Sequence, residues 1–202
     1  ARTTRRPSEP SEGRPPAGPP APGAHMAGFI SLADAKAQMR VDSSDEDATI
    51  QRLIDAASRH VERLSGYVAG QRSETFRFDV FGRQLELRLR PVDLESIEIR
   101  YLDASGAEQT FTDFRATEKH GTVRLVPAIG ACWPSAACAV GAISVSAQVG
   151  FALDEDGAAP DTPDHVLHAV RICVASWFLD REEGPVPQTV IDLLDDDRAR
   201  RV

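Results

Sequence analysis

The chain has 202 residues, of which 42% are hydrophobic and 27% are charged, and its formal net charge is -8. Such a length accommodates one domain or at most two small ones, and this ordinary balance excludes a wholly disordered or fibrous protein. No apolar run approaches the roughly 20 residues that a membrane-spanning helix needs, and the N-terminus lacks the apolar segment of a secretory signal.

Residues 1–25 are predicted to form a flexible arm. They contain seven of the fourteen prolines and four arginines but almost no apolar bulk, so burial cannot offset the entropy lost on ordering. The arm carries a net charge of +2, which leaves -10 on the remaining 177 residues. A body this acidic does not attract a polyanion such as DNA nonspecifically. Two interpretations of the arm stay open: a segment that orders on a partner, or a plain tail or leader.

Two helices are predicted over residues 31–66. Ser31 followed by Asp34 resembles a capping box, which marks the start of the first helix, and residues 41–44 break it. Acidic residues 45–47 open the second helix, where the helix dipole favours carboxylates, and Gly66 supplies its stop. Apolar residues recur at helical spacing along the second helix, at Ile50, Leu53, Ile54, Ala57, Val61 and Leu64.

From residue 74 to residue 150 the apolar residues alternate with polar ones, which is typical of strands. Six short strands are predicted, with turn residues such as Asp103 to Gly106 between them. They centre on residues 76–80, 85–89, 97–101, 111, 123–125 and 143–149. Short strands separated by turns favour a small antiparallel sheet or sandwich.

The helical period returns at residue 163. The apolar residues on one face of this helix are Val166, Val170, Cys173 or Val174, and Trp177. The pair Gly184-Pro185 is expected to end it, and a shorter helix is predicted over residues 187–194. The chain is therefore predicted to be α+β: a helical bundle, made of two N-terminal helices and the C-terminal helices, with an inserted antiparallel β module. Residues 26–202 would form this domain, with helices at about 31–66 and 163–194 and the β module at about 74–150.

No phosphate loop, nucleophile elbow or zinc-protease helix is found in the sequence. The acidic run over residues 42–47 fails the calcium-loop pattern, because Asp47 stands where glycine is needed and Leu53 where glutamate is needed. Four potential zinc ligands, Cys132, Cys138, His165 and His168, lack tight Cys-x-x-Cys spacing. They are interpreted as buried cysteines and ordinary histidines on a helix surface. Three cysteines make no disulfide framework, which favours a reducing compartment. We expect no catalytic residue, no cofactor and no metal ion.

The two N-terminal helices also imitate a helix-turn-helix, whose second helix presents its first residues to the major groove of DNA. Those residues here are Asp45, Glu46 and Asp47, and phosphate repels carboxylates. A helical hairpin packed in a bundle is therefore the favoured interpretation.

The predicted N-terminal helices resemble the opening of head–tail connector (adaptor) proteins of tailed phages and gene transfer agents. The similar stretches are SLADAKAQMRVD over residues 31–42 and DEDATIQRLIDAA over residues 45–57. Later stretches are similar in the same order, namely RPV at 90–92, IEIRYLDASG at 97–106, VSAQVGF at 145–151 and the helix from Pro163 to Glu182. The resemblance covers about residues 31–194. It departs from the family at Ala147-Gln148, where many relatives carry an aromatic and a small residue.

This resemblance implies a structural protein rather than an enzyme. Such adaptors form a ring, a dodecamer, beneath the portal protein, extend the DNA channel and join a stopper or tail-completion protein. DNA passes through the channel without specific binding, and no membrane is involved. The implied locations are the host cytoplasm during assembly and then the neck of the virion or gene transfer agent particle. A DNA-binding packaging factor is the alternative function, and a metal-dependent enzyme of the β module is a third.

Portal contact is expected in the C-terminal segment, residues 185–202, because related adaptors grip the portal with their C-terminal ends. The expected contact residues are Val190, Ile191, Leu193 and Leu194. They form an apolar face on a helix too short to be stable in isolation, so the segment gains order by docking onto something larger. Packing back onto the chain's own bundle is the alternative.

Overall fold

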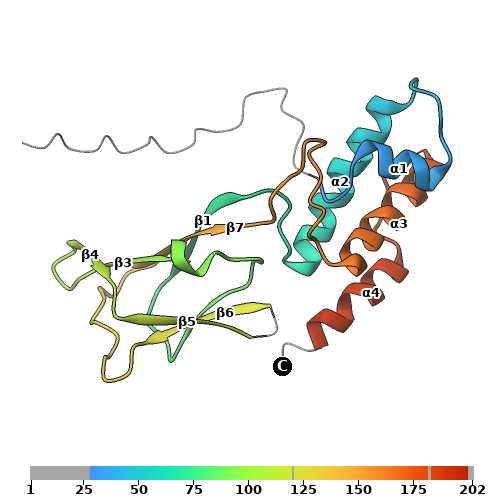
Figure 1. Cartoon of the computed structure of the whole chain (residues 1–202). Coiled ribbons are helices and arrows are strands. Elements are labelled where there is room, and N and C mark those ends of the chain that lie inside the picture. The colour runs from blue at the N-terminus through green and yellow to red at the C-terminus, as the bar shows by residue number, and fades with distance from the viewer. Residues whose placement is uncertain (1–27, 120, 182, 200–202) are drawn as a thin grey trace, which may run out of the picture.

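A computed structural model describes residues 28–119, 121–181 and 183–199, so the predicted arm lies outside the described residues. The described α-helices are α1 (Leu32–Met39), α2 (Asp47–Ser65), α3 (Asp164–Asp180) and α4 (Gln188–Ala199), with a 3-10 turn η1 at Leu94–Ser96. The strands are β1 (Arg72–Phe78), β2 (Leu85–Leu87), β3 (Glu98–Leu102), β4 (Glu108–Phe111), β5 (Phe114–Lys119), β6 (Thr122–Pro127) and β7 (Ile143–Val149). The α-helices gather at one end of an elongated molecule and the strands at the other (Figure 1). The predicted α+β class, a helical bundle with an inserted antiparallel β module, is confirmed.

The two N-terminal helices form much as the sequence predicts. The Ser31 hydroxyl accepts a hydrogen bond from the Asp34 backbone N–H (3.1 Å), which caps α1. α2 ends at Gly66, whose φ of 75° disfavours other residues, and a Cβ there would lie 2.6 Å from the Arg88 carbonyl oxygen. The apolar stripe of α2 faces inward, and its fully buried residues are Ile50, Ile54, Ala57 and Val61.

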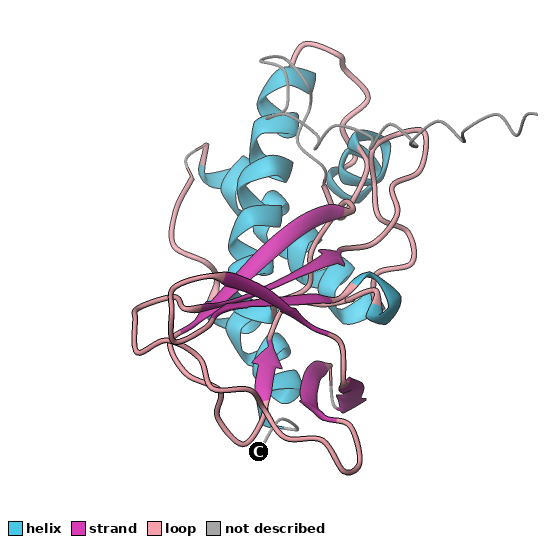
Figure 2. Cartoon of the chain, turned by 90° about the vertical axis from the view of Figure 1, so that its left-hand side faces the viewer, coloured by secondary structure: helices cyan, strands magenta, loops and turns pink. Residues whose placement is uncertain are grey.

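The strands form two antiparallel sheets. The larger has the order β1-β7-β3-β4, and the smaller has the order β2-β6-β5. One apolar cluster joins their inner faces, with Ile99, Ile143 and Val145 from the larger sheet and Leu87 and Leu125 from the smaller. The module is therefore a small sandwich, which Figure 2 shows beside the helices.

β5 is absent from the six strands predicted above. It pairs with β6 along its whole length, from Phe114 opposite Pro127 to Lys119 opposite Thr122. Of its side chains, only Phe114 and Ala116 pack against the module core. An edge strand with so little apolar bulk lacks the alternation by which strands are recognised in a sequence.

α3 and α4 complete the bundle, and their ends differ from the prediction. α3 ends at Arg181 (φ 57°), before the expected stop at Gly184, because the Arg181 N–H bonds two carbonyl oxygens of the last helical turn. α4 runs to Ala199, past the expected end at Leu194. Both helices pack against α2, and α4 also packs against α3.

The bundle has a core of its own. It includes Ile54 of α2 and Trp177 of α3, and Phe29, which precedes α1, is buried there as well. The Phe29 N–H donates a hydrogen bond to Ser58 Oγ of α2 (3.3 Å), so the segment before α1 is part of the bundle. Within the described part of the chain, no helix combines the length and the apolarity that crossing a membrane requires.

The chain enters and leaves the β module at one place. β1 and β7, the first and last strands, pair with each other from Arg72 opposite Val149 to the Phe78 end. Just outside this pair, Gly150 has a φ of 106°, and a Cβ there would lie 2.1 Å from the Gly70 carbonyl oxygen. A side chain at Gly150 would push the two crossing segments apart, so glycine is required for them to lie this close.

Candidate assembly surfaces

A buried arginine holds the β module against the helical bundle. Arg90 is 6% exposed; its Nη2 donates to the Ser65 carbonyl oxygen (2.9 Å), and its Cζ lies 3.8 Å from the centre of the Tyr67 ring. The backbone joins the same segments, since the Val68 N–H donates to the Arg90 carbonyl oxygen (2.9 Å) and the Arg90 N–H to that of Gly66 (2.8 Å). Hydrogen bonds and an aromatic face compensate a buried guanidinium for lost water. We call this contact the Arg90 joint.

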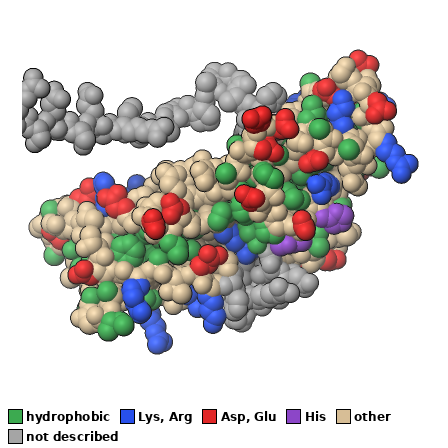
Figure 3. Space-filling model, viewed as in Figure 1, with side chains coloured by type: hydrophobic (Ala, Val, Ile, Leu, Met, Phe, Trp, Pro, Cys, Tyr) green, Lys and Arg blue, Asp and Glu red, His purple; other side chains and the backbone are tan. Residues whose placement is uncertain are grey.

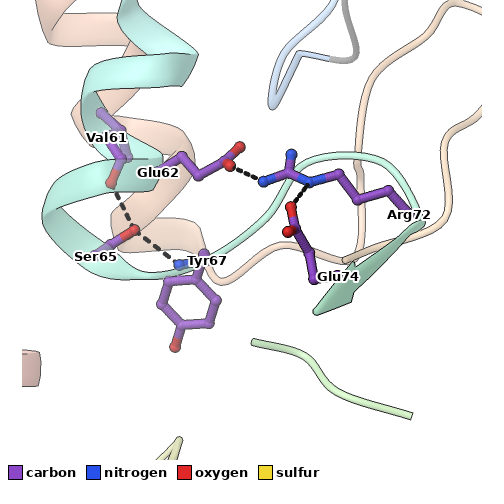
Figure 4. A network of polar contacts seen from close by, with 6 residues as sticks. All are labelled: Val61, Glu62, Ser65, Tyr67, Arg72 and Glu74. Carbon is purple, nitrogen blue, oxygen red and sulfur yellow. Dashed lines mark hydrogen bonds and ion pairs between the residues drawn. The ribbon is translucent and has the colours of Figure 1, made fainter. Parts of the chain in front are cut away.

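An ion-pair network is a second contact between bundle and module (Figure 4). Arg72, at the start of β1, pairs with Glu62 of α2 and donates from Nε to Glu74 Oε1 (2.7 Å). The hydrogen bond to Glu62 is the largest cause that raises the pKa of Arg72 above its ordinary value, against an opposing effect of burial. In the same view, the Ser65 hydroxyl bridges the last turn of α2 and the chain that follows it. These bonds set the orientation of the module relative to the bundle.

The four predicted portal-contact residues lie on α4. Val190 and Leu194 are buried in the bundle core, at 0% and 2% exposure, whereas Ile191 and Leu193 are only partly buried. This differs from an apolar face held free for a partner, because α4 folds back onto α2 and α3, as the alternative interpretation expects. Val190 and Leu194 have no surface left for a partner in this conformation. Portal contact through α4 stays a prediction, and Ile191 and Leu193 are the two side chains with surface to make it.

A different surface is the long loop between β6 and β7, residues 128–142, which we call the uncharged loop. It belongs to residues 125–153, a stretch with no Asp, Glu, Lys or Arg in a chain of which 27% is charged. Ile129 and Val140 on this loop are 89% and 94% exposed, and Val80 in the β1–β2 turn is 67% exposed. The loop lies at the end of the module away from the helices (Figure 1). Charge reaches the loop from β1 and the turn after it, where Arg77 lies next to Gly141 and Asp79 accepts a hydrogen bond from its N–H. Exposed apolar side chains, when they are contiguous, are typical of a protein interface.

Packing and hydrogen bonds fix the uncharged loop in place. Trp133 stacks on Phe81 of the β1–β2 turn, with ring centroids 4.8 Å apart and 13° between the ring planes. The Gly141 N–H donates to Asp79 Oδ1 (2.7 Å), and the Ala137 N–H donates to a carbonyl oxygen of β3 (2.7 Å). The loop is therefore held at several points although it contains no regular structure.

A cleft of about 610 Å³ lies between the start of α2 and the end of α3. Its described lining residues are Glu46, Thr49, Arg52, Leu53, Trp177, Phe178, Leu179, Arg181 and Glu183. Two arginines and two glutamates balance in charge around an apolar floor. Histidine, cysteine and lysine are absent from the described lining, but Glu46 and Glu183 supply carboxylates, and Glu183 Oε1 lies 3.7 Å from His60 Nε2.

Acidic residues are divided unevenly along the chain. Residues 72–149 contain ten acidic and nine basic residues, whereas residues 150–199 contain twelve acidic and three basic residues. Over the module, Figure 3 shows Asp and Glu side chains interspersed with Arg or Lys. The negative charge of the body therefore belongs mainly to the second half of the helical bundle, which repels a polyanion more strongly than the module does.

The potential zinc ligands are spread over both parts of the molecule. The prediction that Cys132 and Cys138 are buried is wrong, because both lie exposed on the uncharged loop. The His165 ring lies in the bundle, with its centroid 6.0 Å from that of the Tyr67 ring. No group of three or more potential metal ligands occurs among the described residues. Cys173 is buried in the bundle core, and burial raises the pKa of its thiol to about 11, so it stays protonated at neutral pH.

Two of these features are missing from the sequence-based expectations. The sequence does contain a signal for the uncharged loop, because 29 consecutive residues without a charged side chain are unusual in such a chain. The sequence contains no signal for the Arg90 joint. Tyr67 and Arg90 are far apart in the sequence and meet only because the two crossing segments pair there.

The molecule thus combines an α+β fold with exposed assembly surfaces. Residues 29–88, from the segment before α1 to just beyond β2, match the model of the phage gp6-like head-tail connector protein family. The resemblance to head–tail connectors that the sequence predicts is confirmed over this part of the chain. No curated protein matches the chain significantly.

Solved structures of gene transfer agent (GTA) particles contain chains with a similar fold. A chain of "Neck of native GTA particle computed with C12 symmetry" has a TM-score of 0.63 at 19% identity, covering 89% of this chain and 91% of that chain. A chain of "Neck of empty GTA particle computed with C6 symmetry" has a TM-score of 0.64 at 20% identity, with coverage of 84% and 88%. A chain of "Virion of native gene transfer agent (GTA) particle" has a TM-score of 0.63 at 20% identity, with coverage of 83% and 88%. At these identities the likeness shows a common fold.

Proposed function

We propose that this chain is a structural adaptor of a phage-like head–tail neck. In this role it forms a ring beneath the portal protein, extends the DNA channel and joins a stopper or tail-completion protein. The observation that carries the proposal is the coincidence, in one molecule, of a match to head-tail connectors and a fold found in chains of GTA necks. The chain would assemble in the host cytoplasm and end in the neck of the particle.

A ring of twelve copies is the proposed oligomer. It is supported by the C12 symmetry of one matched neck structure. A ring contact is heterologous, so it closes only when each subunit takes the correct rotation relative to its neighbour. The portal supplies a template for that rotation, and the chain by itself is expected to stay monomeric.

The chemistry of the described residues supports a structural role over a catalytic one. The body carries -10 outside the arm. Such a charge suits a channel wall, since DNA must slide along it without being retained. Portal contact is assigned to the α4 side of the bundle, where Ile191 and Leu193 retain some exposed surface.

Electron cryo-microscopy of particles assembled with this chain tests the proposal. Twelve copies in a closed ring at the neck are the expected result, and particles made without the chain should contain filled heads that lack tails. A single copy, or a chain absent from the finished neck, contradicts the adaptor role. The packaging-factor alternative predicts the second of these outcomes, together with heads that remain empty when the chain is missing.

A further inference from the structure

We propose that the uncharged loop, residues 128–142, is the surface by which the adaptor binds the next protein of the neck, and that this protein presents an apolar, uncharged surface to it. The inference rests on the proposed function and adds to it the location of the contact and the chemistry of the partner. It is carried by the exposure, the charge and the fixed conformation of the loop.

The loop and its surroundings offer little net positive charge to nucleic acid. Affinity for DNA or RNA comes from lysine and arginine side chains that neutralise phosphates, and residues 125–153 contain neither. The side chain of Arg77 lies next to Gly141, but the Asp79 carboxylate, which accepts a hydrogen bond from the Gly141 N–H, offsets that positive charge and would repel phosphate. A strongly charged protein surface is excluded for a related reason, because its charges would lose water without gaining an opposite charge.

The exposed side chains specify what the occupant must offer. Ile129 and Val140 are 89% and 94% exposed, so each leaves nearly all of its apolar surface in water in the free chain. Covering that surface with an apolar partner is favourable by the hydrophobic effect, whereas a polar partner would gain nothing from it. Interfaces commonly have such an uncharged centre.

The fixed conformation of the loop makes it suitable for binding. The stacking of Trp133 on Phe81 and the hydrogen bond from Gly141 to Asp79 already hold the loop in the free chain. A partner therefore does not have to order it, and less of the binding free energy is lost on association.

A second copy of this chain fits the loop poorly. The described cleft between α2 and α3 has an apolar floor, but Glu46, Arg52, Arg181 and Glu183 also line it. An uncharged loop inserted there would remove these groups from water and replace none of their interactions. The loop also lies at the end of the molecule opposite the helices (Figure 1). The bundle and the loop are therefore free to meet two different proteins.

The two cysteines of the loop allow a direct test in the complete chain. Cys132 and Cys138 are exposed, so maleimide can reach them. Cys173 is buried and its thiol has a raised pKa, so it should not react with maleimide in the folded protein. Maleimide should label two thiols in the free chain and neither of them in tailed particles. With Cys138→Ser, a photoreactive maleimide on Cys132 should cross-link to a different polypeptide of the neck. Leu179→Cys, at a position 80% exposed on the bundle, is the matched control in a Cys132→Ser, Cys138→Ser background.

Substitution of the two exposed apolar residues gives a second, independent test of the contact. Ile129→Asp and Val140→Asp should leave the melting temperature unchanged, because both side chains are exposed, and should lower the yield of tailed particles by about tenfold or more. Leu179→Asp should not lower it. A cross-link to a second copy of this chain, a cross-link to DNA, or full maleimide labelling in tailed particles would each overturn the inference while leaving the adaptor role intact. Absence of the chain from the neck would instead overturn the adaptor role.

Discussion

Arg90 is a charged side chain inside a small protein, and its partners explain how it is tolerated there. A carbonyl oxygen at the end of α2 accepts one of its hydrogen bonds, and the face of Tyr67 covers its guanidinium. These partners belong to the segment that leaves the bundle, whereas Arg90 belongs to the segment that precedes η1. The side chain of Arg90 thus adds to the two backbone hydrogen bonds that already join these segments.

Replacing Arg90 by methionine should lower the free energy of unfolding by about 1–3 kcal/mol. The Ser65 carbonyl oxygen would lose a buried donor, and the Tyr67 ring would lose its cation. Urea denaturation measures the change. Arg88→Met is the matched control, because the Arg88 side chain is 81% exposed and its loss should change stability by no more than about 0.5 kcal/mol. Equal stability of the two variants would show that the Arg90 joint contributes nothing.

Among the elements, α4 has one buried side and one partly exposed side. Its inner side, with Val190 and Leu194, completes the bundle core. Its outer side keeps part of Ile191 and Leu193 exposed. Deleting the chain after Gly184 would remove both sides at once, so a loss of portal binding in that variant would not identify the contact. Single substitutions separate an effect on stability from an effect on portal attachment.

Val190→Ala should lower the free energy of unfolding by roughly 1–3 kcal/mol and leave portal attachment unchanged at a temperature where the variant is folded. Leu193→Ser should do the opposite, with a small change in stability and a clear loss of attachment, because its side chain is only partly buried. Thermal melting and co-sedimentation with portal-bearing heads measure the two effects. Normal attachment of Leu193→Ser, and of Ile191→Ser beside it, would remove portal contact from α4.

Elements whose side chains are buried at regular intervals could be predicted from the sequence. Elements that depend on edge pairing or on backbone hydrogen bonds could not. α2 has a complete apolar stripe and a glycine stop, so its course could be read directly. β5 is an edge strand with two small contacts to the core, and α3 ends on Arg181 through backbone hydrogen bonds that no residue type announces. The apolar face of α4 was predicted, but its partner was not, because a short amphipathic helix has the same pattern whether it packs on its own chain or on another.

Over the whole molecule, the division of charge separates a helical part that repels polyanions from a nearly neutral β module. Residues 150–199 hold twelve acidic residues against three basic ones, and residues 72–149 are almost balanced. An adaptor with this distribution can surround DNA without holding it. A packaging factor would need a basic surface of the opposite kind.

Residues 26–202 should accordingly bind duplex DNA no more tightly than about 10⁻⁴ M at physiological salt, the weak end of nonspecific binding. Fluorescence anisotropy with duplexes of different sequence measures this. The full chain is the comparison, because the arm, residues 1–25, carries +2 and can add nonspecific affinity of its own. Submicromolar binding that depends on the DNA sequence, in the fragment without the arm, would favour the packaging factor.

The crossing at Gly70 and Gly150 has a consequence for the history and the mechanics of the molecule. Because the module departs and returns through adjacent backbones, its ends are as close as those of a domain that can be grafted into a host loop. The same closeness means that tension on the far tip of the module is carried by two covalent chains in parallel, so the tip can bear load without peeling from the helices.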